Sequence, residues 1–422
     1  MNRLFSGVRD NFSFFIYSMI YIYLFGVGYL MSTFMNFFYG YQTIGRNETV
    51  YIMIINYLLA VIAYKIARSV LPKRTYPIVL NITRFSYTTS SLALLTVGVM
   101  LVFNRLYQMG FKPFWVYGGV PITESGLVGV GLTVLSIASG LDCLYLFSRK
   151  SSNSKIFILL LFIAKFSILV LFGRSRSLFL WLGIMFVYFL VIMGIGNHRF
   201  RTILFMFIII AFLSMMFYRI LLIKSKIDDP VLISRITLAS LAPEFRDFSN
   251  FINKYDPNSN TETGKRILGN MIATLLPDEV WQFLGVNKYE IGLFNRGSLF
   301  HSILFGSQNS TVGVRITYFG EMYIVNGIYG IFLGTLIIST LLGLLSKYNY
   351  SLFTWLMTIN LAISQFNGLN VITLRIIPIL IVVLIAEFNW AVAIKELYYK
   401  SGHTLGGQNE RLSAIGRESA GV

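Results

Sequence analysis

The chain has 422 residues, of which 55% are hydrophobic and only 13% are charged, and its formal net charge is +17. Soluble proteins contain about 25% charged residues, so this composition excludes a soluble globular protein and indicates that much of the surface faces lipid. The single cysteine, Cys143, excludes an intramolecular disulfide framework and a thiolate metal site.

Apolar runs of about 20 residues, the length that crosses a bilayer core, recur along the chain. We expect the first run to stay in place as a span, because it is too long for a signal peptide and no small-residue cleavage site follows it. The predicted spans cover 12–35, 50–71, 86–103, 126–147, 156–172, 177–195, 202–222, 323–345, 353–369 and 373–393.

These spans divide the chain into four parts. Residues 1–222 hold the first seven spans, 223–322 form a long extracytoplasmic loop, and 323–394 hold the last three spans. The polar tail, 395–422, is rich in glycine and serine and is expected to be disordered.

Lysine and arginine in the short loops orient the spans. With a cytoplasmic N-terminus, the inner segments contain twelve of these residues and the short outer loops contain five. This distribution predicts that both termini are cytoplasmic. It also explains the positive net charge as a topology signal, so no nucleic-acid partner is expected.

The long loop differs from the rest of the chain, because it carries ten acidic and ten basic residues. Loops of this length are usually functional. Residues 230–255 have apolar residues at helical spacing, and 264–285 are typical of two short helices broken at Pro277. These apolar faces are too short to span, so we expect helices that lie on the membrane or cap the helix bundle.

The stretch LVLFGRSRSLFLWL places Arg174 and Arg176 in a tight outer tip between predicted spans five and six. Two interpretations are open. The arginines either snorkel to lipid headgroups, or they hold a shared anion, since guanidinium groups bind phosphate bidentately and stay charged when partly dehydrated. Arg219, Arg315 and Arg375 are predicted on the same side. Together the five cations predict a basic pocket for a lipid phosphate or pyrophosphate.

A carboxylate is predicted at the mouth of span eight. Glu321 follows Arg315 by six residues in NSTVGVRITYFGEMYIVNGIYGIFLG, and the glycines after it are small residues that let neighbouring helices approach closely. Spacing favours an ion-pair strut over an acid/base group. His301, the one predicted extracytoplasmic histidine, is a second candidate acid/base group.

Two further charges lie inside predicted spans. Asp142 in span four and Lys165 in span five either pair with each other or belong to a transport path, and pairing is favoured. The sequence contains no Walker A loop, no D-x-D pair and no nucleophile elbow. We therefore expect neither a metal nor a cofactor.

This layout resembles the bacterial oligosaccharide repeat-unit polymerases of O-antigen and capsule synthesis, the Wzy type. The resemblance extends over nearly the whole chain and rests on about ten spans, one long loop in the second half, the G-R-x-R-like tip and GEMYIVNGIYG. One arginine pattern of that family, R-x10-G, is missed by one residue, because eleven residues separate Arg315 from Gly327.

The resemblance implies an all-α, GT-C-like polytopic protein of the bacterial cytoplasmic (inner) membrane. It also implies metal-independent glycosyl transfer at the outer face, with sugar repeat units on undecaprenyl pyrophosphate as the substrate. A chain-length regulator and a flippase would be pathway partners. The residues expected to bind the pyrophosphate are Arg174, Arg176, Arg315, Arg219 and Arg375. Glu321, or else His301, would accept the proton of the acceptor hydroxyl.

Two alternatives are open. A lipid-linked oligosaccharide flippase or exporter would have inverted repeats and discontinuous helices, and the sequence indicates neither. An O-antigen ligase would carry a histidine–glycine pattern that HSILFGSQNSTVG misses by one residue.

Overall fold

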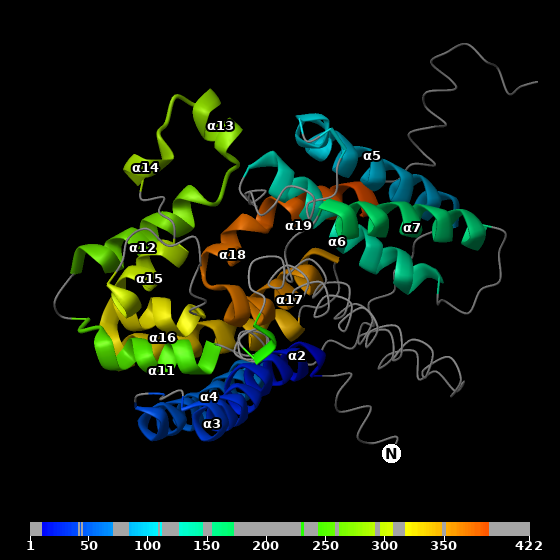
Figure 1. Cartoon of the computed structure of the whole chain (residues 1–422). Helices are drawn as coiled ribbons and strands as arrows, with labels where there is room; N and C mark the ends of the chain where they lie inside the picture. The colour runs from blue at the N-terminus through cyan, green and yellow to red at the C-terminus, as the bar shows by residue number, and fades with distance from the viewer. Residues whose placement is uncertain are drawn as a thin grey trace, which may run out of the picture.

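The computed structural model describes residues 11–40, 43, 45–70, 84–108, 110–111, 126–146, 154–172, 229–231, 244–257, 261–291, 296–306, 317–347 and 352–387. Every regular element within these ranges is a helix (Figure 1). The predicted all-α class is therefore confirmed for the described part of the chain. Predicted spans 177–195 and 202–222 and the tail lie outside it.

The helices fall into two groups by sequence position. The helices within the predicted spans are α2 (Phe12–Tyr21), η1 (Ile22–Val27), α3 (Gly28–Tyr39), α4 (Arg46–Val70), α5 (Arg84–Gln108), α6 (Leu127–Leu146), α7 (Ser154–Phe172), α16 (Tyr318–Lys347), α17 (Leu352–Asn367), α18 (Asn370–Leu374) and α19 (Ile376–Glu387). The helices of the long loop are α11 (Glu244–Lys254), α12 (Thr261–Ala273), α13 (Asp278–Phe283), α14 (Lys288–Ile291) and α15 (Arg296–Phe305).

Three helical segments are long and apolar enough to cross a membrane. They are Phe12–Phe38, Arg46–Val70 and Tyr318–Lys347. They coincide with three predicted spans, and shorter apolar helices occupy other predicted ranges. A membrane protein is thus supported, while the count of ten spans stays a prediction.

The bundle is built around α16, which packs along α4 and α17. A Cβ atom at Gly343 would lie 2.8 Å from the Tyr64 carbonyl oxygen, so the missing side chain lets α16 approach α4 closely. Helices α5, α6 and α7 pack on one another, and α19 joins them to α17. In Figure 1, helices α5, α6 and α7 lie to the right, and α2 to α4 lie at the bottom.

The loop helices gather at one end of the bundle, on the left in Figure 1. Phe245, Phe248 and Phe251 lie on one face of α11 and are buried. The Oγ1 atom of Thr49, near the start of α4, lies 2.9 Å from Oγ of Ser249 in α11. The prediction of loop helices that cap the bundle is confirmed for α11.

Two loop predictions are tested directly. Helix α11 forms within the range 230–255, where helical spacing was found. Helices α12 and α13 are separated at Pro277, which is the residue before α13, as predicted. The Leu127 amide at the start of α6 donates to Oε2 of Glu279 in α13, at 3.1 Å, so α13 also contacts this end of the bundle.

Helix α16 is interrupted near its start and doubles back on itself. Asn326 (φ −158°, ψ 40°) and Gly327 (φ 56°, ψ −144°) are not helical, and a positive φ favours glycine. The hydroxyl oxygens of Tyr318 and Thr335 are 3.0 Å apart. An unbroken helix would separate these residues by about 25 Å. Residues 318–325, which we call the first arm, therefore run back along the second arm, 328–347.

This hairpin corrects two expectations from the sequence. The glycines after Glu321 accommodate the chain's own first arm, because a Cβ atom at Gly330 would clash with the Met322 carbonyl oxygen and one at Gly334 would lie 2.7 Å from the Met322 side chain. The absence of discontinuous helices was also wrong. The second arm, with about 20 residues, is still roughly 30 Å long and can span a membrane.

Gly330→Ala should open this hairpin, because the clash is with backbone that cannot move alone. We expect a loss of about 1–3 kcal/mol, typical of overpacking, measured as a lower thermal midpoint in detergent. Gly26→Ala is the matched control, since a Cβ atom there meets only Ile22, at 3.5 Å. Equal midpoints for the two variants would contradict the hairpin.

Candidate functional site

The structure describes only part of the predicted site. Glu321 and Arg375 are described with their side chains, and His301 lies on α15, with its backbone alone described. Four predicted residues lie outside the described part of the chain: Arg174, Arg176, Arg219 and Arg315. The basic pocket at the outer leaflet therefore stays a prediction.

Glu321 lies on the first arm of α16 and is buried inside the bundle, with 1% of its surface exposed. Thr335, beside the start of this arm, is about 12 Å along the second arm from the turn at Gly327. The carboxylate thus lies inside the helix bundle, rather than at the mouth of a continuous span as the sequence suggested.

The Glu321 carboxylate joins two interrupted helices. Its Oε2 atom accepts a hydrogen bond from the Leu369 amide at 2.6 Å. Leu369 lies in the turn between α17 and α18, where Gly368 has a φ of +95°. Amides at a helix start have no partner within the helix, and a negative charge there is favourable. The carboxylate therefore stabilises the start of α18 through a hydrogen bond to its backbone.

Arg375 lies at the opposite end of the same short helix. It falls between α18 and α19 and is buried, with 3% of its surface exposed. It is six positions after Leu369, about 9 Å along a helix axis. The structure thus brings a predicted anion-binding arginine and the predicted carboxylate to the two ends of α18. Thr274, following α12, covers α18 through a 3.0 Å contact between its Oγ1 and that of Thr373.

A row of buried hydroxyl groups next to the first arm was missed from the sequence. The Tyr17 hydroxyl of α2 lies near those of Tyr318, Thr335 and Ser339. Within the described part of the chain, Tyr17 Oη and Ser339 Oγ meet these neighbouring hydroxyls in poor hydrogen-bond geometry. The Gln365 side-chain amide donates to the Tyr17 carbonyl oxygen at 3.0 Å. We call these residues the hydroxyl row. Buried polar groups of this kind bind water or the polar groups of a ligand.

A sequence signal for the hydroxyl row exists. Thr335 and Ser339 are four residues apart within one predicted span, so they lie on the same helix face. Polar residues on one face of a span usually point into the bundle. That Tyr17 of α2 would lie beside them could not be predicted without the fold.

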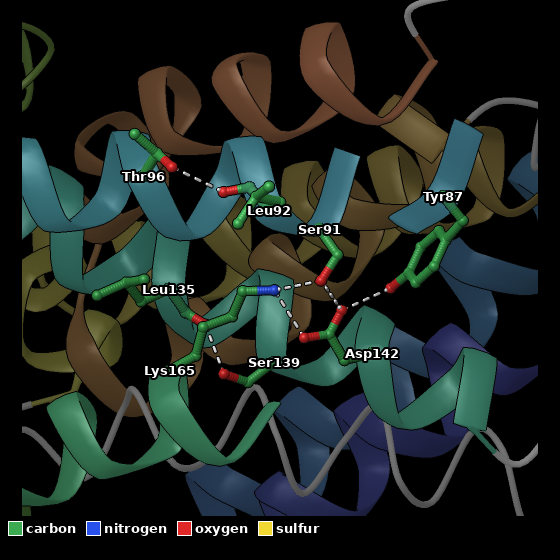
Figure 2. A network of polar contacts seen from close by, with 8 residues as sticks. All are labelled: Tyr87, Ser91, Leu92, Thr96, Leu135, Ser139, Asp142 and Lys165. Carbon is green, nitrogen blue, oxygen red and sulfur yellow. Dashed lines mark hydrogen bonds and ion pairs between the residues drawn. The ribbon is translucent and has the colours of Figure 1, made fainter. Parts of the chain in front are cut away.

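The second polar cluster is the Asp142–Lys165 pair, which confirms the predicted pairing (Figure 2). The Lys165 Nζ atom lies 2.6 Å from Oδ2 of Asp142, and both side chains are buried. Ser91 donates to Oδ1 of Asp142 at 2.8 Å and accepts from Lys165 at 2.7 Å. The Tyr87 hydroxyl donates to the same Oδ1 at 3.0 Å.

This network ties α5, α6 and α7 together. Both oxygens of Asp142 accept hydrogen bonds, and the Lys165 ammonium donates two. A buried ion pair whose hydrogen bonds are satisfied is a structural element. We therefore place the candidate site at Glu321, Arg375 and the hydroxyl row.

The described residues also bear on metal chemistry. Among those that the structure describes, no three histidine, cysteine, aspartate or glutamate side chains converge as a metal site would require. No protein-family model, curated protein or solved structure matches this chain.

Asp142→Asn and Lys165→Met should each destabilise the bundle strongly. Each leaves one buried charge without its counterion, which costs about 3–5 kcal/mol. The double variant removes both charges and should lose much less than the sum of the two. Unfolding of the purified protein in detergent measures this coupling. Additive losses would show that the two side chains do not interact.

Glu321→Gln and Glu321→Ala should separate the strut from the charge. Glutamine retains an oxygen that can accept from the Leu369 amide, so the thermal midpoint should stay near that of the unaltered protein. Alanine leaves a buried amide without a partner, which costs about 1–3 kcal/mol. If both variants unfold at the same temperature as the parent, Glu321 does not hold α18.

Proposed function

We propose that the chain polymerises oligosaccharide repeat units carried on undecaprenyl pyrophosphate, at the outer face of the bacterial cytoplasmic membrane. The observation that carries this proposal is the buried Glu321 carboxylate on a folded-back arm, beneath helices of the predicted extracytoplasmic loop. A base held in this way could meet a sugar hydroxyl where the lipid-linked substrate leaves the membrane.

The loop helix α11 is fixed on the first arm. The Phe248 ring of α11 lies 6.5 Å from the Phe319 ring, two residues before Glu321. The Tyr323 hydroxyl donates to the Ile252 carbonyl oxygen at 3.1 Å. The Pro257 ring, just after α11, lies close to Gly327 at the turn. A Cβ atom at Gly327 would be 3.3 Å from the Cγ atom of this ring. A loop packed in this way supports a stationary site better than a moving one.

The reaction would transfer a sugar chain from one lipid to another. The acceptor hydroxyl attacks the anomeric carbon of the donor chain, and the bond from that carbon to the pyrophosphate oxygen breaks. The pyrophosphate leaves with the electron pair, and the hydroxyl proton passes to Glu321. General base catalysis contributes about 10²–10⁴-fold. His301 is the second candidate base.

The leaving group gathers negative charge, which arginines can neutralise. Arg375 is the described member of the predicted set, with Arg174, Arg176, Arg219 and Arg315 as the other members. A single well-placed donor in such a site is worth about 3–4 kcal/mol. The bond from Leu369 to Glu321 orients the carboxylate, as a base in a catalytic constellation requires.

One observation favours the lipid-linked oligosaccharide flippase or exporter as a second candidate. Helix α16 is broken at Asn326 and Gly327, and α17 is separated from α18 by a turn at Gly368. Discontinuous helices that meet inside a bundle are typical of transporter substrate sites. The ligase would use the same chemistry with a different acceptor, so only the products distinguish it.

Purified protein in vesicles with a synthetic undecaprenyl-pyrophosphate repeat unit should give a ladder of products on a gel, with or without EDTA. Glu321→Gln should slow ladder formation about 10²–10⁴-fold. Glu387→Gln is the matched control, because Glu387 also accepts from a backbone amide at a helix start, that of Leu352 at 3.1 Å.

The outcomes are distinct. A full ladder from Glu321→Gln would remove this residue as the base. Movement of the substrate across the vesicle membrane without new bonds would establish the flippase instead. Transfer of a finished chain to a lipid-A core or peptidoglycan acceptor would establish the ligase.

A further inference from the structure

An apolar groove runs between the first span and α4, separate from Glu321 and Arg375. We call it the lateral groove. Its volume is about 280 Å³. Five aromatic rings line it: Tyr21, Phe25, Tyr29, Tyr57 and Phe245. Ile22, Ile54 and Leu58 also line it and are more than half exposed, at 55%, 53% and 56%. In a membrane protein, a groove with such an apolar rim opens sideways to lipid.

The groove lies along a local irregularity in the first span. Residues Ile22–Val27 form a π-helical turn, η1, which widens the helix. Gly26 lies in this turn and lines the groove. A Cβ atom at Gly26 would meet only Ile22, at 3.5 Å, so a side chain there would enter open space. Short π-helical turns are rare and occur frequently at functional sites.

One end of the groove carries a cation. Arg46 begins α4 and lies one helical turn before Val50, which lines the groove, so both lie on one face of the helix. The Arg46 guanidinium carbon lies 5.3 Å from the centroid of the Tyr29 ring. Its Nη1 atom donates to the Thr33 hydroxyl at 3.2 Å. Among the described residues, Arg46 forms no ion pair with a carboxylate.

This arrangement suits a phosphate. An arginine stacked on an aromatic ring keeps its edge donors available, and those donors match phosphate oxygens bidentately. An apolar groove that leads to such an arginine has the two features of a phosphate-headed lipid, a chain and an anionic head. Arg46 also lies at the end of the bundle that α11 covers, since Thr49 on the same helix contacts Ser249.

The groove shares a wall with the arm that carries Glu321. Phe25 lines the groove, and its ring centroid lies 5.1 Å from that of Phe319 on the first arm. Phe245 of α11 closes the groove and contacts Tyr29, with ring centroids 5.6 Å apart. A lipid held in the groove would therefore have its head beside the loop helices and its chain behind the first arm.

We infer that the lateral groove binds the polyprenyl chain of one of the two lipid-linked substrates, with Arg46 on its phosphate, an inference that rests on the proposed function. Aromatic walls favour this occupant over an ordinary phospholipid. Rigid rings leave gaps along a straight acyl chain, whereas the methyl branches of an isoprenoid chain fill them and gain the dispersion contacts that a gap forfeits.

Binding of undecaprenyl phosphate alone, without sugar, tests this site. Labelled undecaprenyl phosphate is titrated into the full-length protein in detergent, with phosphatidylglycerol as a competitor that also has an anionic phosphate headgroup. Gly26→Leu fills the groove, and Arg46→Gln removes the phosphate donor. Each should weaken binding about tenfold or more, the loss expected for a filled pocket or a missing charged hydrogen bond. Arg68→Gln, at the opposite end of α4, is the charge-matched control and should bind within about twofold of the parent.

The variants must also keep the fold, so thermal midpoints near that of the parent are required, with Gly26→Ala as a milder second variant. Unchanged binding by both Gly26→Leu and Arg46→Gln would overturn the assignment. Equal competition by phosphatidylglycerol would overturn it in favour of ordinary bilayer lipid.

The test is separable from the proposed function. Glu321→Gln should bind undecaprenyl phosphate normally, because its carboxylate is not in the groove. In the ladder assay, Gly26→Leu should raise KM and leave kcat unchanged. Selective binding without any ladder would leave the groove as a lipid site and remove the polymerase. A ladder that forms with unaltered KM in Gly26→Leu would support the polymerase and remove the groove as a site for its substrate.

Discussion

The hydrogen bond from the Leu369 amide to the Glu321 carboxylate is the constraint on which the centre of this structure depends. It connects two helices that are both interrupted, α16 at Gly327 and the α17–α18 pair at Gly368. Without it, the buried start of α18 would present an amide to an apolar interior. An unsatisfied buried amide costs about 1–3 kcal/mol, so each break stabilises the other.

The rest of the α17–α18 turn is satisfied in the same manner. The Gly368 amide donates to the Ser364 carbonyl oxygen at 2.8 Å, and the Asn360 side-chain amide donates to the Ile372 carbonyl oxygen at 3.0 Å. Side chains of α16 and α17 thus supply both an acceptor and a donor to the backbone around α18. Irregular backbone at this depth is tolerated where it is buried in protein or lines a cavity, and here it is buried among polar side chains.

Hydropathy was sufficient to predict the described helices within the predicted spans, because an apolar run of about 20 residues most often forms a membrane-spanning helix. The break before α13 was predictable from Pro277, whose ring cannot continue a helix. The pairing of Asp142 with Lys165 was predictable because a charge inside a span seeks a partner.

The hairpin in α16 was not predicted, and the reason is physical. Residues 318–347 are predominantly apolar on both sides of the turn, so the mean hydropathy does not mark it. The local signal was the dipeptide Asn326-Gly327, a pair that commonly forms turns because both residues tolerate a positive φ. Whether such a pair bends a helix depends on what the freed arm can pack against. Here it packs against Gly330 and Gly334, with Phe319 among the rings of α2, η1 and α11. These packing partners are distant in the sequence, so the local pattern could not reveal them.

The π-helical turn at Ile22–Val27 likewise has no marker in the apolar pattern.

The two buried polar clusters differ in a way that separates structure from function. Polar groups inside a membrane bundle are costly, so each must be retained for a reason. Around Asp142, four side chains form four hydrogen bonds with one another and hold α5, α6 and α7 together. The hydroxyl row is different, because the hydroxyls of Tyr17 and Ser339 are buried beside the first arm and, in the described part of the chain, meet neighbouring hydroxyls in poor hydrogen-bond geometry. Burying a hydroxyl is costly unless it is hydrogen-bonded. The row thus lies along the arm that carries Glu321, and its hydrogen bonds are less firmly fixed than those of the ion pair, which places the candidate site at the hairpin.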